Sequence, residues 1–494
     1  MKLIFRGHDF RYAVEQSLLA FFPDQRPVYD GEDSDAAIVT LSAGRLLHTA
    51  ATTLTVGGRT AQGISRIEIP AGTDPYEQER LKQRIVKLSF FKAARSITGV
   101  TPAWGALTGI RPAKLAAGLL EEGKSEAETD RILRNTYFVS PARRKLCIQC
   151  AQAGLEAKKE LLPEEISLYV GIPFCPTRCA YCSFVSNSVE KSFHWVEPYL
   201  TALSAEIDRA AAMVRDLGLR VKSFYMGGGT PTTLPADQLD RLLGQLGEAF
   251  DLSGMVESTV EAGRPDTITR EKLDALRRNG VTRVSVNPQS MEDHVLAAIG
   301  RRHSGDEIRR AVALVQEAGF PHVNMDLIAG LPEDTPAGFR RTLDEVIGFG
   351  TDNITVHTLS LKKGSRITLE GTRIPTVEEV AEMLDYADPA LRNAGFGPYY
   401  LYRQKYMSGS FENVGWCRPG GTGWYNIYIM EELHSILSLG AGGSTKMVDP
   451  VHNRIERVFN LKYPQEYVQR PEKIAANQEA FRAFYSNQNP MAHV

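Results

Sequence analysis

The stretch "YVGIPFCPTRCAYCSF", residues 169–184, holds three of the six cysteines in this chain of 494 residues. Cys175, Cys179 and Cys182 follow the spacing CxxxCxxC directly after a run of β-forming residues. Three thiolates in one loop suit an iron–sulfur cluster or another metal. A structural zinc site is the alternative, although zinc prefers four ligands, commonly as two CxxC pairs. A cluster with only three cysteine ligands keeps one iron open for a substrate or cofactor.

The composition is that of a soluble globular protein, with 43% hydrophobic and 23% charged residues. The net charge of −2 gives no electrostatic case for binding nucleic acid or an anionic membrane surface. The N-terminal "MKLIFRGHDF" lacks the apolar core of a secretion signal, and no apolar run is long enough to predict a membrane span. So few cysteines in a long chain do not predict a disulfide framework. We therefore expect a cytoplasmic protein with reduced thiols.

From about residue 164 the sequence alternates short β-rich runs with longer amphipathic helical patterns. Six such units predict a parallel sheet with right-handed crossovers. Because a closed barrel of this kind needs eight strands, we expect a partial (β/α)6 TIM-like barrel of class α/β. The predicted strands are 167–172, 222–226, 256–261, 282–287, 322–328 and 353–359, and the predicted helices lie near 195–217, 235–249, 269–279, 304–319 and 335–349.

We expect three domains. Residues 1–163 form an N-terminal α/β plus helical domain, in which "LTVGGRT" predicts a hairpin turn. Residues 164–370 form the barrel core, preceded by the charged boundary "EAKKELLPEE". Residues 371–494 form a mostly helical extension that covers the substrate, with a segment rich in glycine and aromatic residues.

Ligands of such a sheet bind at the carboxyl ends of its strands, and the unusual residues of this chain fall there. The cysteine loop follows the first predicted strand, and "GGGTPT", residues 227–232, follows the second. Glycines let the backbone approach a ligand closely, although they also form ordinary turns. The later strands end in polar residues, namely Glu261, Gln289, Asp326 and His357. Each of the first three is either a ligand contact or the cap of a neighbouring helix or turn, and His357 is either a base or a strand-end histidine with its hydrogen bonds satisfied.

The motifs carry a family resemblance. The cysteine triplet after the first strand of a βα sheet resembles the radical S-adenosylmethionine (SAM) enzymes. Together with "GGGTPT", "VNPQSM", "IGRRH" and "MDLIAGLPEDT", it is similar to the oxygen-independent coproporphyrinogen III oxidase group. That group includes the HemN dehydrogenases, the HemW heme chaperones and the HemZ enzymes. The flanking "LTGIRPAKL" and "YRQKYM…ENVGW" look most like the HemZ branch.

The resemblance implies a function and its cofactors. It implies a [4Fe–4S] cluster on Cys175, Cys179 and Cys182, SAM as second cofactor, and an electron donor such as flavodoxin or ferredoxin. The implied reaction is the anaerobic oxidative decarboxylation of coproporphyrinogen III to protoporphyrinogen IX in heme biosynthesis, through a 5′-deoxyadenosyl radical. Two alternatives remain open, namely a heme chaperone that does not decarboxylate and another radical SAM enzyme that modifies a tetrapyrrole.

The resemblance also implies residue roles. Tyr169 matches a tyrosine near the cluster and substrate, and we expect it and Glu261 to be catalytic. Two positions depart from the dehydrogenase pattern, since Phe184 replaces a fourth cysteine and Gly171 replaces a histidine. The residues that match SAM contacts are Gly227, Gly228, Gly229, Thr230, Glu261, Gln289, Arg301 and Asp326.

Substrate contacts are expected in the C-terminal region, because guanidinium and ammonium groups suit the four propionates of the macrocycle. The candidates are Arg403, Lys405 and Arg418, and the alternative is a packed aromatic segment whose cations lie along its surface.

Three further cysteines lie outside the triplet. Cys147 and Cys150 are a redox pair, a cluster ligand set or two packed residues one turn apart on a helix, and Cys417 is a candidate extra ligand or radical relay.

Overall fold

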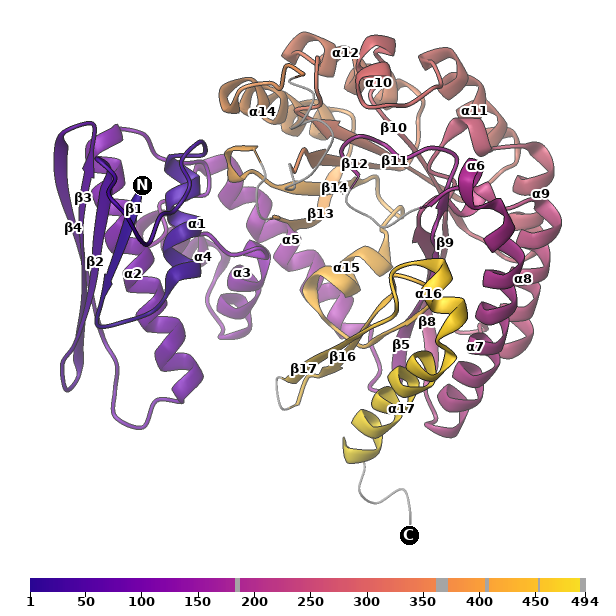
Figure 1. The fold of residues 1–494 in the computed structure, drawn as a ribbon, viewed down its shortest axis with the longest axis horizontal. Coiled ribbons are helices and arrows are strands. Elements are labelled where there is room, and N and C mark those ends of the chain that lie inside the picture. The colour runs from indigo at the N-terminus through magenta and orange to yellow at the C-terminus, as the bar shows by residue number, and fades with distance from the viewer. Residues whose placement is uncertain (183–186, 361–371, 405–407, 452–453, 489–494) are drawn as a thin grey trace. The chain divides into compact units, whose positions relative to one another are not determined.

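The computed structural model describes residues 1–182, 187–360, 372–404, 408–451 and 454–488 (Figure 1). The chain forms two compact units, which are Met1–Ala151 with Leu401–Glu412, and Gln152–Tyr400 with Asn413–Val494. The expected three-domain division stays a prediction, and the structure adds that a short C-terminal segment belongs to the first unit. In the described ranges no helix is both long and apolar enough to span a membrane.

The first unit has a four-stranded sheet with helices packed on it. The strands β1 (Lys2–Arg6), β2 (Ala36–Ala43), β3 (Leu47–Val56) and β4 (Arg59–Glu68) pair in chain order. The predicted hairpin joins β3 to β4, and Gly57 and Gly58 of its turn have φ angles of 53° and 76°, which glycine adopts without strain. The helices are α1 (Arg11–Phe21), α2 (Pro75–Thr98), α3 (Pro112–Glu121), α4 (Glu126–Asn135) and α5 (Pro141–Lys159), the last of which continues into the second unit.

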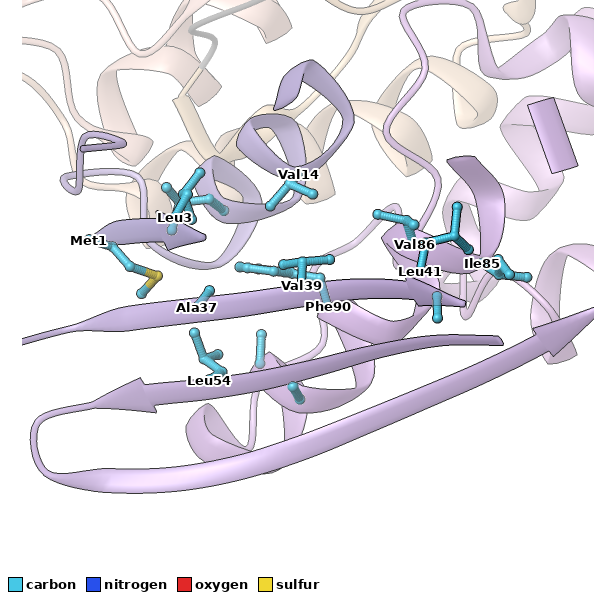
Figure 2. Packing of buried hydrophobic residues seen from close by; sticks show 14 of the residues in the cluster. Met1, Leu3, Val14, Ala37, Val39, Leu41, Leu54, Ile85, Val86 and Phe90 are labelled. Atoms are coloured by element: carbon cyan, nitrogen blue, oxygen red, sulfur yellow. The ribbon is translucent and has the colours of Figure 1, made fainter. Parts of the chain in front are cut away.

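The core of this unit consists of apolar side chains from the sheet and from helices α1 and α2. Val14, Leu54 and Phe90 are completely buried in it. Figure 2 shows Leu3 of β1 and Val14 of α1 among the side chains of this cluster. The alternation of buried and partly buried residues along β2 and β3 is the pattern of a sheet covered on one face.

The second unit contains the predicted six parallel strands and the crossover helices between them, which confirms the partial barrel. The strands are β5 (Glu165–Ile172), β8 (Arg220–Gly228), β9 (Glu257–Glu261), β10 (Arg283–Gln289), β11 (His322–Ala329) and β12 (Asn353–Thr358). The helices among them are α6 (Val189–Ser192), α7 (Val196–Asp216), α8 (Ala236–Ala249), α9 (Arg270–Arg278), α10 (Asp293–Ala298), α11 (Gly305–Glu317) and α12 (Pro336–Gly348). Two short strands, β6 (Phe174–Cys175) and β7 (Asn187–Ser188), pair beside the barrel.

The C-terminal region contributes strands as well as helices, which the sequence analysis did not predict. Strand β14 (Asn413–Cys417) pairs antiparallel with β12, and β15 (Ile436–Leu439) pairs parallel with β5. With β13 (Gly397–Tyr402), β16 (Ser444–Asp449) and β17 (Arg454–Phe459), they extend the sheet to eleven strands. The helices of this region are α14 (Val377–Asn393), α15 (Trp424–Glu431), α16 (Pro464–Gln469) and α17 (Pro471–Gln488).

The segment around α15 meets the barrel at the amino end of its strands. Arg283, which begins β10 and is buried, donates from Nη2 to the Thr422 carbonyl oxygen at 3.0 Å. The N–H of Tyr425 donates to a carboxylate oxygen of Glu257, the first residue of β9, at 3.2 Å. These bonds anchor the segment across the amino end of the strands, and the carboxyl ends of the strands form the mouth of the barrel.

The packing of β13 on β14 leads to a prediction. A Cβ atom added at Gly415 would overlap the ring of Tyr400 and lie 2.8 Å from its Cζ atom. We expect Gly415→Ala to lower the free energy of unfolding by about 2 kcal/mol, because overpacking forces the ring to move. The measurement is urea unfolding. Gly397→Ala is the matched control in β13, since nothing lies within 4 Å of its added Cβ atom. Equal stability of the two variants would contradict this account of the strand packing.

Candidate active site

The cysteine loop is connected to the barrel by backbone hydrogen bonds. The N–H of Gly229 donates to the Ile172 carbonyl oxygen, and that of Thr230 to the Phe174 carbonyl oxygen, both at 2.7 Å. On its other side, the N–H of Ala180 donates to the Ile299 carbonyl oxygen at 3.0 Å. The loop is therefore held at the end of β8 on one side and at the end of helix α10 on the other.

The two backbones approach each other so closely that the end of β8 has to consist of glycine. A Cβ atom on Gly229 would overlap the Phe174 carbonyl oxygen and lie 2.7 Å from that of Ile172. Gly228 has a φ angle of 102°, which L side chains rarely adopt. Glycine at 228 and 229 is therefore explained by backbone packing, whether or not a ligand also approaches there.

Positive charge lies beside the thiols. Arg264, which is 3% exposed, donates from Nη1 to the Thr177 hydroxyl at 2.8 Å and lies 4.0 Å from the Cys179 sulfur. The Thr230 hydroxyl lies 3.5 Å from the Cys175 sulfur. All three cysteines of the loop are half-buried. Guanidinium groups and hydroxyl donors stabilise the negative charge of thiolates, which is the form that binds metal.

Two buried polar residues at the mouth have unsatisfied atoms. Gln289 ends β10 with a φ angle of 69°, and its Oε1 has no hydrogen-bond partner in the described part of the chain. Arg301 donates from Nη1 to the Asn287 carbonyl oxygen at 2.5 Å and from Nη2 to the Tyr181 hydroxyl at 3.3 Å. Its Nε is also buried without a partner among the described residues. Buried polar atoms of this kind are normally satisfied, so both fit a polar ligand.

Two carboxyl groups at the mouth have different charge states. Burial raises the pKa of Glu261 to about 7, and the charge of Asp326 adds to the rise, while a hydrogen bond from the Tyr225 hydroxyl at 2.6 Å opposes it. Burial would also raise the pKa of Asp326, but its bond and charge interaction with His357, 3.6 Å away, keep it below the ordinary value. Asp326 is thus ionised when Glu261 still holds its proton.

Three tyrosines line the barrel interior below Glu261. The ring centroids of Tyr225 and Tyr425 are 4.6 Å apart, and those of Tyr169 lie 6.3 Å from Tyr225 and 6.4 Å from Tyr425. Tyr169 was a predicted site residue, and Tyr225 and Tyr425 were missed. Tyr225 comes two residues before Gly227, so the period of two along a strand could have identified it. Nothing in the sequence indicates that Tyr425 reaches the interior.

The comparisons with known proteins agree with this geometry. Residues 169–346 match the model of the Radical SAM superfamily. The chain is 37% identical over 404 residues to the oxygen-independent coproporphyrinogen-III oxidase-like protein HemZ of Bacillus subtilis, which covers 80% of this chain and 81% of that protein. It belongs to the HemZ branch of the radical SAM coproporphyrinogen III oxidase family.

Other relatives of this HemZ-type chain have different names. The heme chaperone HemW of Mycobacterium tuberculosis is 30% identical over 315 residues, covering 62% of this chain and 74% of that protein. Among solved structures, the coproporphyrinogen III oxidase HemN of Escherichia coli matches with a TM-score of 0.51 and 24% identity, covering 65% of this chain and 72% of that one. The similarity to the HemN structure supports the assignment of the barrel fold.

The family uses a [4Fe–4S] cluster and SAM, and the residues of the HemZ-type chain fit both. Cys175, Cys179 and Cys182 supply three thiols from one loop. In the described ranges no three Cys, His, Asp or Glu side chains surround one point as ligands of a single ion do. A cluster does not need such convergence, because each cysteine binds a different iron. Gln289 and Arg301 offer the unsatisfied polar atoms that a bound SAM would meet.

The replacement of the dehydrogenase histidine by Gly171 has a structural reason. A Cβ atom at this position would lie 2.9 Å from the Ala441 carbonyl oxygen, since β15 pairs directly with β5. The space that a histidine would fill is therefore occupied by backbone. The second departure, Phe184, lies outside the described residues.

Of the three expected substrate contacts, the structure describes Arg403 and Arg418. Arg403 is buried in the first unit, where its Nε donates to the Ser410 carbonyl oxygen at 2.9 Å and its Nη1 to that of Leu107 at 2.5 Å. These bonds join the "LTGIRP" and "YRQKYM" motifs and argue against a substrate role for Arg403. Lys405 lies outside the described residues.

Arg418 is at the wrong end of the barrel for substrate binding. Its N–H donates to the carbonyl oxygen of Asp352, which directly precedes β12, and its guanidinium lies over the Phe396 ring at 4.8 Å. Cys417 pairs with Asn353, the first residue of β12, and is likewise at the amino end. Cys417 and the cysteine loop, which follows the carboxyl end of β5, therefore lie at different ends of the barrel strands.

The glycine packing predicts an effect on the cysteine loop. Gly229→Ala should push Phe174 away and lower both the stability, by about 2 kcal/mol, and the iron bound after anaerobic reconstitution. Iron and sulfide analysis together with urea unfolding measures this. Gly247→Ala is the control, since nothing lies within 4 Å of its added Cβ atom. Wild-type iron content in Gly229→Ala would show that the close contact between Gly229 and Phe174 does not control iron binding by the cysteine loop.

The raised pKa of Glu261 predicts a pH dependence of stability. Its pKa rises from 4.5 to about 7 on folding, so the folded state holds this proton more tightly. The resulting stabilisation is complete below about pH 4.5 and is lost as the pH rises through about 7, by about 3 kcal/mol in total. Glu261→Gln removes this dependence. Urea unfolding of both proteins at several pH values measures this dependence. If the free energy of unfolding varied with pH in the same way in both proteins, the raised pKa of Glu261 would be contradicted.

Proposed function

We propose that this protein catalyses the anaerobic oxidative decarboxylation of coproporphyrinogen III to protoporphyrinogen IX. The supporting observation is the identity to HemZ over four fifths of the chain, in a barrel whose cysteine loop lies at the carboxyl ends of β5 and β8. The reaction removes a hydrogen atom, CO2 and one electron from each of two propionate side chains and leaves two vinyl groups. The proposal includes a cytoplasmic location, an external electron donor and an electron acceptor.

The cofactors supply the radical chemistry. When bound, the cluster and SAM provide a 5′-deoxyadenosyl radical able to abstract hydrogen from a propionate β-carbon. In our proposal Cys175, Cys179 and Cys182 hold the cluster. SAM is held by the backbone of the glycine segment and by the side chains of Thr230, Glu261, Gln289, Arg301 and Asp326.

The chain's own residues would orient SAM and exclude water. Arg301 would meet the SAM carboxylate, because a buried guanidinium with an unsatisfied Nε favours an anion. Glu261, held by Tyr225, is neutral or ionised near neutral pH and can donate or accept a hydrogen bond at a ribose hydroxyl. The three stacked tyrosines form an aromatic wall below the mouth. Such a wall would protect a reactive radical from solvent.

A second candidate is a heme chaperone that keeps the cluster and SAM without decarboxylating a substrate. It is favoured by the 30% identity to a HemW protein. The two candidates differ in outcome, because a chaperone binds heme stoichiometrically and releases no vinyl product.

The test is an anaerobic assay of the reconstituted protein with reductant, SAM and coproporphyrinogen III, analysed by mass spectrometry. We expect protoporphyrinogen IX and 5′-deoxyadenosine from the wild type, and neither from Cys179→Ala. Cys417→Ala should keep both products, since Cys417 lies at the amino end of β12. Deoxyadenosine without a decarboxylated product would contradict the proposed substrate. Stoichiometric heme binding in that case would support the chaperone.

A further inference from the structure

A buried arginine, Arg264, connects the segment after β9 to the middle of the cysteine loop. It comes shortly after the end of β9 at Glu261, and its side chain is 3% exposed. Its backbone is fixed locally, because the Arg264 carbonyl oxygen accepts hydrogen bonds from the N–H of Thr267 at 3.0 Å and from the Thr267 hydroxyl at 2.7 Å. The guanidinium group therefore reaches the loop from a fixed point on the barrel.

Asp266 determines how this guanidinium group is oriented. Arg264 donates from Nε to Oδ1 of Asp266 at 3.1 Å and from Nη2 to Oδ2 at 3.0 Å. A two-point contact of this kind fixes the plane of the guanidinium fork. The Nδ1 atom of the buried His303 lies 3.7 Å from Oδ1 of Asp266, so the carboxylate is itself packed between two basic side chains. Because Nε and Nη2 bind Asp266, Nη1 is directed to the loop.

The Nη1 atom of Arg264 contacts the loop at two residues. It donates to the Thr177 hydroxyl at 2.8 Å and to the Thr177 carbonyl oxygen at 3.3 Å. The same nitrogen lies 4.0 Å from the sulfur of Cys179. Thr177 stands between the first two cysteines of the triplet, and Cys179 is the second. One nitrogen thus binds the loop backbone and brings positive charge to a sulfur that we assign to the cluster.

We propose that Arg264, oriented by Asp266, is a positioning residue that holds the cysteine loop at Thr177 and raises the reduction potential of the cluster through Cys179. This inference rests on the part of the proposed function that places the cluster on the three cysteines, and it does not depend on the substrate. Net charge and hydrogen bonds to the sulfurs help to set the potential of iron–sulfur clusters. Because reduction adds a negative charge, a fixed positive charge beside a ligand sulfur favours the reduced form.

The test uses two measurements that do not depend on turnover. The variants are Arg264→Gln, which removes the charge, and Arg264→Lys, which keeps a charge without the fork. The control is Arg309→Gln, because Arg309 of α11 makes the same two-point contact with Glu345, at 2.6 Å and 3.1 Å, on the exposed surface. Amide hydrogen exchange of the metal-free protein is followed at residues 177–180. The midpoint potential of the reconstituted protein is measured by electron paramagnetic resonance without SAM.

We expect amide exchange at residues 177–180 to be about tenfold faster in both Arg264 variants, because neither side chain can bind Asp266 and Thr177 at once. The midpoint potential should become more negative in Arg264→Gln and should change less in Arg264→Lys. Arg309→Gln should keep the wild-type value in both measurements. Wild-type exchange in Arg264→Gln would overturn the role in holding the loop, and a wild-type midpoint potential would overturn the role at Cys179.

Urea unfolding is measured alongside, since Arg264→Gln leaves Asp266 without its guanidinium partner. If Arg264→Gln does not fold, the same two measurements on Arg264→Lys decide the proposal, and wild-type values in both would overturn it. If the wild type assembles no [4Fe–4S] cluster, the proposed function fails. The exchange measurement on the metal-free protein still decides whether Arg264 holds the loop.

Discussion

The site depends on the close contact between the backbone of residues 172–174 and the glycine segment at the end of β8. Two hydrogen bonds of 2.7 Å connect these backbones, and they form only because Gly229 has no side chain. The contact fixes the start of the cysteine loop on the barrel. Without it, the loop would keep its cysteines but lose its position relative to the polar residues at the ends of β9, β10 and β11.

Positively and negatively charged side chains lie at different places around the mouth of the barrel. Arg264 and Arg301 bring positive charge to the cysteine loop, while Glu261, Asp326 and His357 lie on β9, β11 and β12. Because the two carboxyl groups titrate in different ranges, one can stay ionised while the other carries a proton. A site of this kind can hold a zwitterionic ligand such as SAM, whose carboxylate, amino group and hydroxyls need different partners.

The sequence predicted the barrel and the location of its mouth well, because both follow from periodic patterns. The six strands appear where β-rich runs alternate with helical patterns, and Glu261, Asp326 and His357 share one face through the strand period of two. The failures concern long-range contacts. Arg403 looked like a substrate contact among tyrosines, but the chain buries it against Leu107, nearly three hundred residues earlier. Tyr425 reaches the interior only because Glu257 and Arg283 anchor the segment around α15, and no local pattern reports that.

The central claim is that the three-cysteine loop holds a [4Fe–4S] cluster with an open iron that binds SAM. Electron paramagnetic resonance of the reconstituted, reduced protein tests it most directly, with and without SAM. The account predicts a [4Fe–4S]+ signal in the wild type that changes when SAM is added, and no such signal in Cys179→Ala. A wild-type signal that SAM leaves unchanged would contradict the open-iron assignment.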